Sequence, residues 1–425
     1  MQKLFFTIHL RERIIIRETM EMTILKSILF IGVNKSGSSR EATKAAESLG
    51  YFVILFTNNF KQLEQRELYP DVHKMVFIDT MNLEEMREEI NKLITIGLDI
   101  QNIVSFVDPF VHVASLLCDE FCNNLTSSEA IKIMEDKEET RKFLLNEPYT
   151  PKFQLIHSQQ EFPKTVHFPA IIKSPKSTGS KDVLLATNKR QLKKHLTSLR
   201  DKYPEESIIV EEYLDGPQYL VEAIIYEQQA HIVAVIKQDV TKDQRFIITG
   251  YGVLANVPKK LKSDLESILN SIVTAFNLKT GALHLELRST ANGWKLIEIN
   301  PRISGGAMNK MIKAAFGINL VEETLKLFLG EKPNLEPLEQ KFVYTKYLTV
   351  TRKGILEKVT GKLRATQSPN VYEVYIKPKK GTLLIPPLSM GHRYAYIIAQ
   401  GKSIIEAKKF ANKAAKEIKF HMREK

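Results

Sequence analysis

Two glutamates near residue 290 have the types and spacing that most clearly suggest chemistry. Glu286 alternates with leucines in the stretch LHLELR, and Glu298 and Asn300 alternate with isoleucines in the stretch IEIN. A period of two is typical of a β-strand, so each segment projects its polar side chains to one face and its apolar side chains to the other. Asn292-Gly293 lies between the segments and predicts a hairpin turn that pairs them.

The length of the turn decides whether Glu286 and Glu298 share a face. A two-residue loop of Asn292 and Gly293 would direct the carboxylates to opposite faces, whereas a three-residue loop, 291–293, would place Glu286 opposite Glu298. Gly293 supplies the left-handed conformation that ends such a three-residue loop. Opposed carboxylates repel each other unless cations bind between them. Oxygen ligands of this kind suit Mg²⁺ shared with phosphate oxygens, although an ordinary solvated hairpin face has the same residue types.

Two further segments could bind a nucleotide, and each is also compatible with an ordinary turn. Lys173 ends an apolar strand, and the Ser/Thr/Gly loop after it can offer backbone N–H groups and hydroxyls to phosphates. This loop has a single glycine, Gly179, and does not match the P-loop pattern. The stretch IIVEEYLDGP runs from an apolar strand through residues 211–214 into a Gly-Pro turn. An extended segment of this kind can hydrogen-bond an adenine edge through its backbone.

The elements that position these residues follow from hydrophobic periodicity. A strand at 27–33, a helix that begins at the capping box Ser38-x-x-Glu41, and a strand at 51–56 form a βαβ unit, and a later strand at 103–107 extends the same parallel sheet. A second capping box predicts a helix from Thr126. From about residue 151 the chain becomes rich in strands, and a last helix is predicted to begin at Ser403.

Composition limits the classes of protein that fit. The chain has 425 residues, enough for several domains, and no apolar stretch of about 18 residues that would predict a transmembrane helix. Its net charge of +12 comes from Lys and Arg spread along the chain. This distribution favours anionic substrates such as ATP over nucleic acid. The two cysteines, Cys118 and Cys122, form no disulfide framework and indicate reduced thiols in a cytoplasmic protein. Residues 1–24 are interpreted as an N-terminal extension.

Taken in order, these segments resemble the ATP-grasp superfamily from about residue 27 to 335. The resemblance rests on DKEETR at 136–141, IIK at 171–173, VEEYLDGP at 210–217, GALHLELR at 281–288 and IEINPRISGG at 297–306. It implies an α/β and α+β protein: a Rossmann-like domain at 25–125, then a two-lobed ATP-grasp domain at 126–335. The smaller lobe would span about 137–214 and the larger lobe about 215–335. A small α+β subdomain would occupy 336–425.

The resemblance also implies roles for individual residues. Lysines would contact the ATP phosphates, a loop would close over them, the segment from Glu211 would hold adenine, and carboxylates would bind Mg²⁺ or Mn²⁺. Gln218 departs from the family, which often has a ribose-binding glutamate there. The implied set is catalytic Arg302; ATP-binding Lys137, Lys173, Ser177, Thr178, Gly179, Ser180, Glu211, Glu212, Tyr213, Leu214, Gln218 and Lys237; metal-binding Glu286, Glu298 and Asn300; and substrate-pocket Gly305 and Gly306.

Within the superfamily, the chain is most similar to L-amino-acid (dipeptide) ligases. The similarity lies in the paired motifs at 281–288 and 297–306 and in the tail, which contains SMGHRYAYIIAQGKSIIEA. It implies an ATP-dependent ligase that forms an amide through an acyl phosphate, with small carboxylate and amine substrates such as amino acids, no membrane partner and a homodimer as one compatible assembly. A biotin-carboxylase-like or other carboxylate ligase, and an ATP-binding module without catalysis, are the alternatives. Gly305 and Gly306 predict a roomy substrate pocket, unless they serve only a tight turn.

Overall fold

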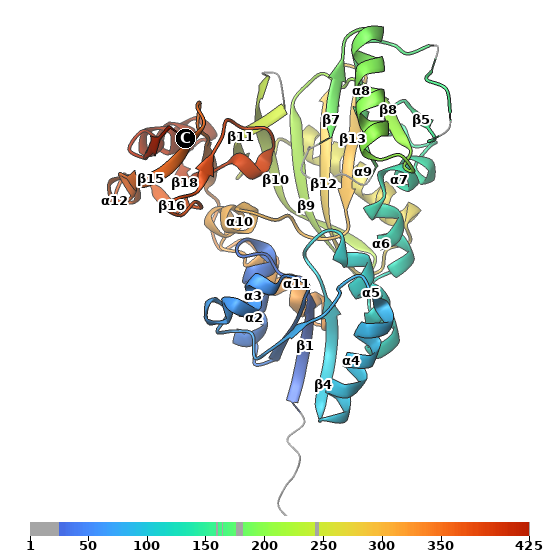
Figure 1. Ribbon diagram of the computed structural model, residues 1–425, viewed down its shortest axis with the longest axis vertical. Helices are drawn as coiled ribbons and strands as arrows, with labels where there is room; N and C mark the ends of the chain where they lie inside the picture. The colour runs from blue at the N-terminus through green and yellow to red at the C-terminus, as the bar shows by residue number, and fades with distance from the viewer. Residues whose placement is uncertain (1–24, 159, 164, 176–181, 243–245, 425) are drawn as a thin grey trace, which may run out of the picture. The chain divides into compact units, whose positions relative to one another are not determined.

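The computed structural model describes residues 25–158, 160–163, 165–175, 182–242 and 246–424. They form two compact units: unit 1 contains the described residues up to 34 and residues 42–124, and unit 2 contains residues 35–41 and the chain from 125 onward. The fold is mixed α/β, with a parallel sheet in unit 1 and antiparallel sheets in unit 2 (Figure 1). The predicted fold class is confirmed. The predicted division into four parts stays a prediction.

Unit 1 is built on a four-stranded parallel sheet in the order β3-β2-β1-β4. The predicted βαβ unit is present, since β1 pairs with β2 in parallel and α2 begins at Ser38. The predicted strand at 103–107 is wrong in its bounds, because its first half alternates buried and half-buried residues and carries no continuous apolar run. The elements are β1 (Leu25–Ile31), α2 (Ser38–Ser48), β2 (Phe52–Thr57), α3 (Phe60–Glu64), η1 (Arg66–Leu68), β3 (Lys74–Phe77), α4 (Leu83–Thr95), β4 (Leu98–Val104) and α5 (Phe110–Phe121).

The first part of unit 2 is a small antiparallel sheet in the order β5-β8-β6-β7. Leu192, Leu196 and Leu199 of α8 pack on its buried face, where they contact the hydrophobic cluster of this lobe. The predicted helix from Thr126 begins instead after Ser127, whose side chain accepts a hydrogen bond from the Ala130 amide. The elements are α6 (Ser128–Glu135), α7 (Lys137–Phe143), β5 (Phe153–Ile156), β6 (Ala170–Lys173), β7 (Val183–Ala186), α8 (Lys189–Lys202) and β8 (Ile208–Glu212).

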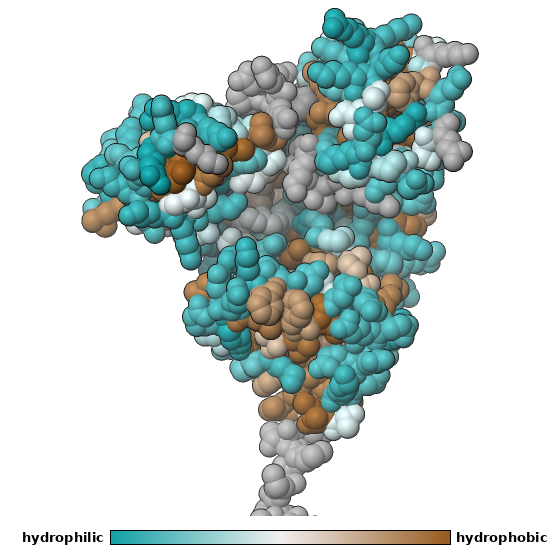
Figure 2. Space-filling view, viewed as in Figure 1, coloured by the Kyte–Doolittle hydropathy of each residue, from teal (hydrophilic) through white to brown (hydrophobic). Residues whose placement is uncertain are grey.

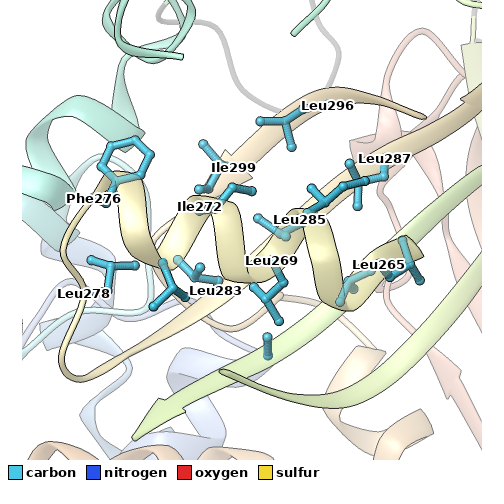
Figure 3. Packing of buried hydrophobic residues seen from close by; sticks show 14 of the residues in the cluster. Leu265, Leu269, Ile272, Phe276, Leu278, Leu283, Leu285, Leu287, Leu296 and Ile299 are labelled. Carbon is cyan, nitrogen blue, oxygen red and sulfur yellow. The ribbon is translucent and has the colours of Figure 1, made fainter. Parts of the chain in front are cut away.

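The rest of unit 2 is organised by an eight-stranded sheet in the order β13-β12-β9-β10-β11-β14-β18-β16. One face of β9, β12 and β13 is covered by α9, whose leucines and isoleucines are directed at Leu283, Leu285 and Leu287 (Figure 3). The opposite face therefore remains for polar side chains. The elements are β9 (Gln218–Tyr226), β10 (Gln229–Lys242), β11 (Phe246–Val253), α9 (Lys259–Ala275), β12 (Gly281–Thr290), β13 (Gly293–Asn300), α10 (Met308–Phe316) and α11 (Leu320–Phe328).

The chain after residue 336 does not form a separate sheet system throughout. Its strands β14, β18 and β16 continue the eight-stranded sheet, and only β17, β15 and β19 form a small sheet of their own. The predicted last helix is confirmed, because the Ser403 hydroxyl accepts from the Glu406 amide at 3.2 Å. The elements are β14 (Phe342–Leu348), β15 (Gly354–Thr360), α12 (Lys362–Thr366), β16 (Val371–Ile376), β17 (Leu383–Leu384), η2 (Met390–His392), β18 (Ala395–Gly401), α13 (Ile404–Ala415) and β19 (Lys419–Arg423).

The surface of unit 2 around α8 is hydrophilic (Figure 2). This helix carries several exposed basic residues and keeps only its leucine stripe buried. Part of the positive charge of the chain therefore lies on a solvated helix face, which needs no ligand to explain it. Among the described residues, none of the helices is both long and apolar enough to cross a membrane.

Candidate active site

A cleft in unit 2 gathers half of the residues that the sequence singled out. Nine of its lining residues were predicted: Lys137, Lys173, Glu211, Glu212, Tyr213, Leu214, Gln218, Glu286 and Glu298. The other lining residues are Ile171, Val183, Gln238, Ile248, Arg288, Ile297 and Met390. The small sheet, the large sheet and the segment before β18 all contribute, so the cleft combines positive, negative and apolar groups from distant parts of the chain.

The two glutamates of the hairpin lie directly opposite each other. Glu286 of β12 pairs with Glu298 of β13, and His284 pairs with Asn300, as the sequence analysis predicted. Both strands bury their apolar residues against α9, so the glutamates and Asn300 share the free face. Three oxygen-bearing side chains are thereby brought to one end of one hairpin.

The turn that produces this register is not the predicted one. Thr290 pairs with Gly293, so the loop has two residues, 291–292, and Gly293 (φ 98°) opens β13. The register then shifts between Glu286 and Leu287, where Ile297 has no partner of its own. A β-bulge of this kind adds one residue to one strand and turns the following side chains to the other face. The bulge, and not the turn length, aligns the two carboxylates.

A buried charge cluster lies under one side of the cleft. The Glu211 carboxylate accepts from Arg141 Nε and pairs with Lys173 Nζ, both at 2.7 Å. All three residues are buried. Burial opposes ionisation of Glu211, but Arg141 and Lys173 outweigh it and lower the pKa of Glu211. The cluster holds two cations and one anion, so it carries one positive charge in excess.

Lys173 is the cation of this cluster that can lose its proton. Burial lowers the pKa of Lys173 to about 8, although the Glu211 carboxylate opposes the shift. Arg141 is a guanidinium and stays charged. An anion placed beside Lys173 would supply the missing negative charge. The end of β6 is therefore prepared for an anionic ligand.

The cleft carboxylates are held by neighbouring side chains. Lys137 Nζ lies 2.9 Å from Glu298 Oε1, and the Gln218 amide donates to Glu286 Oε2 at 2.8 Å. Arg288 donates to the other end of Gln218 and, at 2.7 Å, to the Leu214 carbonyl. Glu286 and Glu298 are thus oriented before any ligand binds, and Gln218 serves as a bridge within the protein.

A second charged pair lies behind Glu286. His284 Nδ1 and Glu222 Oε1 are 2.5 Å apart in the buried interior, and the other Glu222 oxygen accepts from the Ser304 amide at 3.1 Å. Burial disfavours a charged imidazole, but the Glu222 carboxylate outweighs it and raises the pKa of His284 to about 10. His284 Nε2 also lies 3.8 Å from Glu286. This chain ties the 303–306 turn to the face that carries Glu286.

Several predicted site residues lie elsewhere. Lys237 is on the opposite face of the large sheet, because the next residue, Gln238, lines the cleft and strand side chains alternate. Arg302 follows β13 and donates to the Ile303 carbonyl at 3.0 Å. Neither Arg302 nor Asn300 lines the cleft. Residues 177–180 (Ser177, Thr178, Gly179 and Ser180) lie outside the described residues.

The turn of Gly305 and Gly306 is exposed. A Cβ added at either glycine would meet no described atom within 4 Å. Gly306 has φ +66°, whereas no such conformation applies to Gly305. The positive φ of Gly306 supports the tight-turn explanation, and the substrate pocket at these glycines stays a prediction.

Sequence reasoning missed the charged residues that support the cleft from behind. Arg141 was noted only as part of DKEETR at 136–141, and Glu222 was not singled out. A single carboxylate inside an apolar strand could have been detected, since such a residue is rarely buried without a partner. Its partner His284, 62 positions away, could not have been identified without the pairing of β9 with β12.

The comparisons with known proteins agree with this geometry. The model of the ATP-grasp domain matches residues 166–310, and the model of the L-amino acid ligase C-terminal domain 2 matches residues 346–423. The fold and these matches define the class: this is an ATP-grasp enzyme, an ATP-dependent ligase. The chain contains an ATP-grasp domain and an L-amino acid ligase C-terminal domain 2.

Individual relatives are distant in sequence. The chain is 24% identical over 351 residues to the uncharacterized protein y4rH of Sinorhizobium fredii, covering 80% of this chain and 72% of that protein. It is 22% identical over 263 residues to carnosine synthase 1 of Homo sapiens, covering 56% of this chain and 32% of that protein. A crystal structure of L-amino acid ligase from Bacillus licheniformis has a TM-score of 0.79 at 18% identity, covering 95% of this chain and all of that one.

Proposed function

We propose that this protein joins the carboxylate of one amino acid to the amine of another, through an acyl phosphate, with release of ADP and phosphate. One observation carries the proposal. Glu286 and Glu298 face each other in a cleft that also holds Lys137 and Lys173. Opposed carboxylates beside two lysines suit a triphosphate that arrives with a divalent cation. The C-terminal match to L-amino acid ligases supports amino acids as the substrates.

The residues fit Mg²⁺ by the chemistry of their donors. Glu286, Glu298 and Asn300 offer only oxygen ligands, and Mg²⁺ prefers oxygen and commonly completes its shell with phosphate oxygens and water. No group of three His, Cys, Asp or Glu side chains that could hold a metal occurs in the described part of the chain. These residues therefore do not form a complete metal-binding site by themselves, and phosphate oxygens would have to coordinate the ion as well. When bound, the ion would neutralise charge on the transferred phosphoryl group.

The lysines of the cleft are the proposed phosphate ligands. Lys173 has excess positive charge around it, and Lys137 can exchange Glu298 for a phosphate oxygen when a metal ion takes over that carboxylate. The first substrate carboxylate would attack the γ-phosphate, and the amine would then displace phosphate from the acyl phosphate. Arg302, two residues beyond Asn300, is proposed to stabilise the negative charge that develops on the transferred group. The chain would contribute positioning and electrostatics more than covalent chemistry.

The adenine base is proposed to lie along the backbone of 212–214. The side chain of Glu211 cannot contact it in this arrangement, because its two oxygens already bind Arg141 and Lys173. Gln218 likewise bridges Glu286 and Arg288, so a role in ribose binding would require it to leave them. Arg288 instead fixes the Leu214 carbonyl. Residues 212–214 would therefore recognise adenine through main-chain groups that side chains hold in position.

A coupled assay of ADP release over pairs of amino acids tests the proposal. We expect ADP release that requires Mg²⁺ and an amino acid, with a dipeptide of the corresponding mass detected by mass spectrometry. Omission of the amine donor serves as the control, because an acyl phosphate then has no nucleophile except water. ADP release without any amide product, over all twenty amino acids, would reject the amino acid ligase and leave another carboxylate ligase.

A further inference from the structure

The segment before β18 brings a guanidinium to the free face of the large sheet. Met390, in η2, lines the cleft, and Arg393 follows three residues later. The Arg393 guanidinium carbon lies 3.9 Å from the ring centre of Tyr347 and 5.7 Å from that of Tyr251. Tyr251 pairs with Gln238, which also lines the cleft. Arg393 is therefore on the same side of the sheet as Glu286 and Glu298.

The surroundings of Arg393 leave its charge unpaired. Its hydrogen bond among the described residues is a long one, 3.4 Å from Nη1 to the Tyr251 hydroxyl. Its Nε is buried and has no partner among the described residues, and no described carboxylate forms an ion pair with it. A buried guanidinium normally has a carboxylate or phosphate partner, because transfer from water is otherwise costly. Aromatic faces compensate only part of this cost.

The side chain is nevertheless held in a defined position. Lys377 donates through Nζ to the Gly391 carbonyl at 3.0 Å, and the amide of Tyr394 donates to the Leu348 carbonyl at 2.8 Å. The Ser389 side chain caps η2. Anchors on both sides of Arg393 fix its backbone, and its guanidinium lies over the ring of Tyr347. An unpaired charge in a fixed orientation is characteristic of a group that waits for a ligand.

The neighbours of Arg393 connect it to both halves of the site. Tyr347 lies against the turn that follows Gly306, since a hydrogen bond from the Ala307 backbone affects its hydroxyl. Burial raises the pKa of Tyr251 to about 12, and the negative charge of Glu286 contributes to that rise. Arg393 thus contacts one tyrosine beside Ala307 and another that is near enough to Glu286 to be affected by its charge. In the sheet order, β9 and β10 separate β11, which carries Tyr251, from β12. Arg393 therefore does not take the place of a phosphate ligand.

We infer that Arg393, set against Tyr251 and Tyr347, binds the α-carboxylate of the amino acid that supplies the amine. This inference rests on the proposed function and specifies one of its two substrates. The reacting carboxylate must lie by Glu286 and Glu298, so a carboxylate at Arg393 is the one that is not activated. A planar guanidinium with a free edge can donate hydrogen bonds to both carboxylate oxygens. The C-terminal domain would thereby select acceptors that are free acids.

The experiment compares an acceptor amino acid with its carboxamide in the wild type and in Arg393→Met and Arg393→Lys. We expect the wild type to prefer the free acid, by kcat/KM, about ten- to hundredfold, the range for a charge-assisted hydrogen-bonded pair. Arg393→Met should lose most of this preference by raising KM for the free acid. Arg393→Lys should retain part of it. The exposed Arg364, which pairs with Glu417, gives the matched control Arg364→Met with an unchanged preference.

Two results would overturn the inference. One is an equal loss for the acid and the amide in Arg393→Met with an unchanged melting temperature. The other is a wild type without preference for the acid. If the wild type forms no amide from any amino acid pair, the proposed function fails first. Direct binding of an amino acid, measured by saturation-transfer NMR on the full chain, then decides separately: equal binding by wild type and Arg393→Met rejects the carboxylate site.

Discussion

Two buried cation sites in unit 2 differ in how their charge is compensated. At the end of β6, Lys173 and Arg141 share the carboxylate of Glu211. Before β18, Arg393 lies against Tyr347 and has no carboxylate partner in the described chain. The first site is assembled by the protein itself and keeps one excess charge. The second has aromatic rings where the first has an anion, so it depends on a ligand for its counterion.

The difference indicates which site contributes to stability and which to selection. A buried ion cluster that loses its single anion leaves two cations without compensation, and the folded state should suffer. Substitution of a guanidinium that already lacks a partner leaves no charge uncompensated, so it should not destabilise the folded state in this way. We therefore expect changes around Glu211 to appear in folding, and changes around Arg393 to appear in the choice of substrate.

The largest effect is expected from Glu211→Gln. The amide keeps the size of the side chain but removes the charge between Lys173 and Arg141, so the free energy of unfolding should fall by about 3–5 kcal/mol. Urea denaturation of both proteins measures this change. Glu212→Gln is the matched control: Glu212 accepts from the Lys152 amide at 2.8 Å, which an amide oxygen can also do. If Glu211→Gln were as stable as Glu212→Gln, the cluster would not need its anion.

Glu298→Gln should affect turnover and leave folding intact. The substitution removes one carboxylate charge from the proposed metal site and disrupts its pair with Lys137. We expect kcat to fall about a hundredfold or more, the usual cost of losing one preorganised electrostatic group, with an unchanged melting temperature. Glu139→Gln changes an exposed glutamate that pairs with Lys142 and should have normal kcat. Near-normal ADP release by folded Glu298→Gln would reject the metal assignment.

The affinity for ADP should depend on the charge of Lys173. The pKa of Lys173 is lowered to about 8 by burial, so the ammonium that attracts phosphate is present below pH 8 and is lost above it. The dissociation constant of MgADP should stay level below that pH and rise by up to about tenfold per unit above it. Isothermal calorimetry at several pH values measures the trend. Lys173→Arg should flatten it, because arginine keeps its charge. A level curve for the wild type would contradict this role.

The smallest effect is expected at the glycine turn. Gly305→Trp adds a large side chain into open space without the positive φ that complicates Gly306. We expect kcat/KM to fall about tenfold or more for a leucine-sized first substrate, and less for alanine. Assays with both amino acids as the activated acid measure the ratio. Equal losses for the two would mean that the turn matters for backbone shape and not for the size of the pocket.

Much of the arrangement was predictable from the sequence because local patterns encode it. The alternation around Glu286 and Glu298 predicted two strands with a polar face, and the capping residues predicted helix starts at Ser38 and Ser403, which the structure confirms. The turn length was wrong even though the opposed glutamates were right. A two-residue loop followed by a bulge at Ile297 pairs Glu286 with Glu298. A three-residue loop without a bulge would give the same pairing. Local sequence does not distinguish these solutions, because the bulge depends on packing against neighbouring strands.

The sequence by itself determined the chemical types in the cleft and the strands that carry them, since period and motif are local properties. Only the tertiary structure decided which charges meet. Glu211 reaches Arg141 across 70 positions, and Glu222 reaches His284 across 62, through a helix against a sheet and through the pairing of β9 with β12. The tertiary structure also decided that Lys237 lies on the face of the large sheet opposite the cleft and that Arg393 lies on the same face as the cleft. Burial turns these pairings into pKa shifts, and burial is a property of the folded chain.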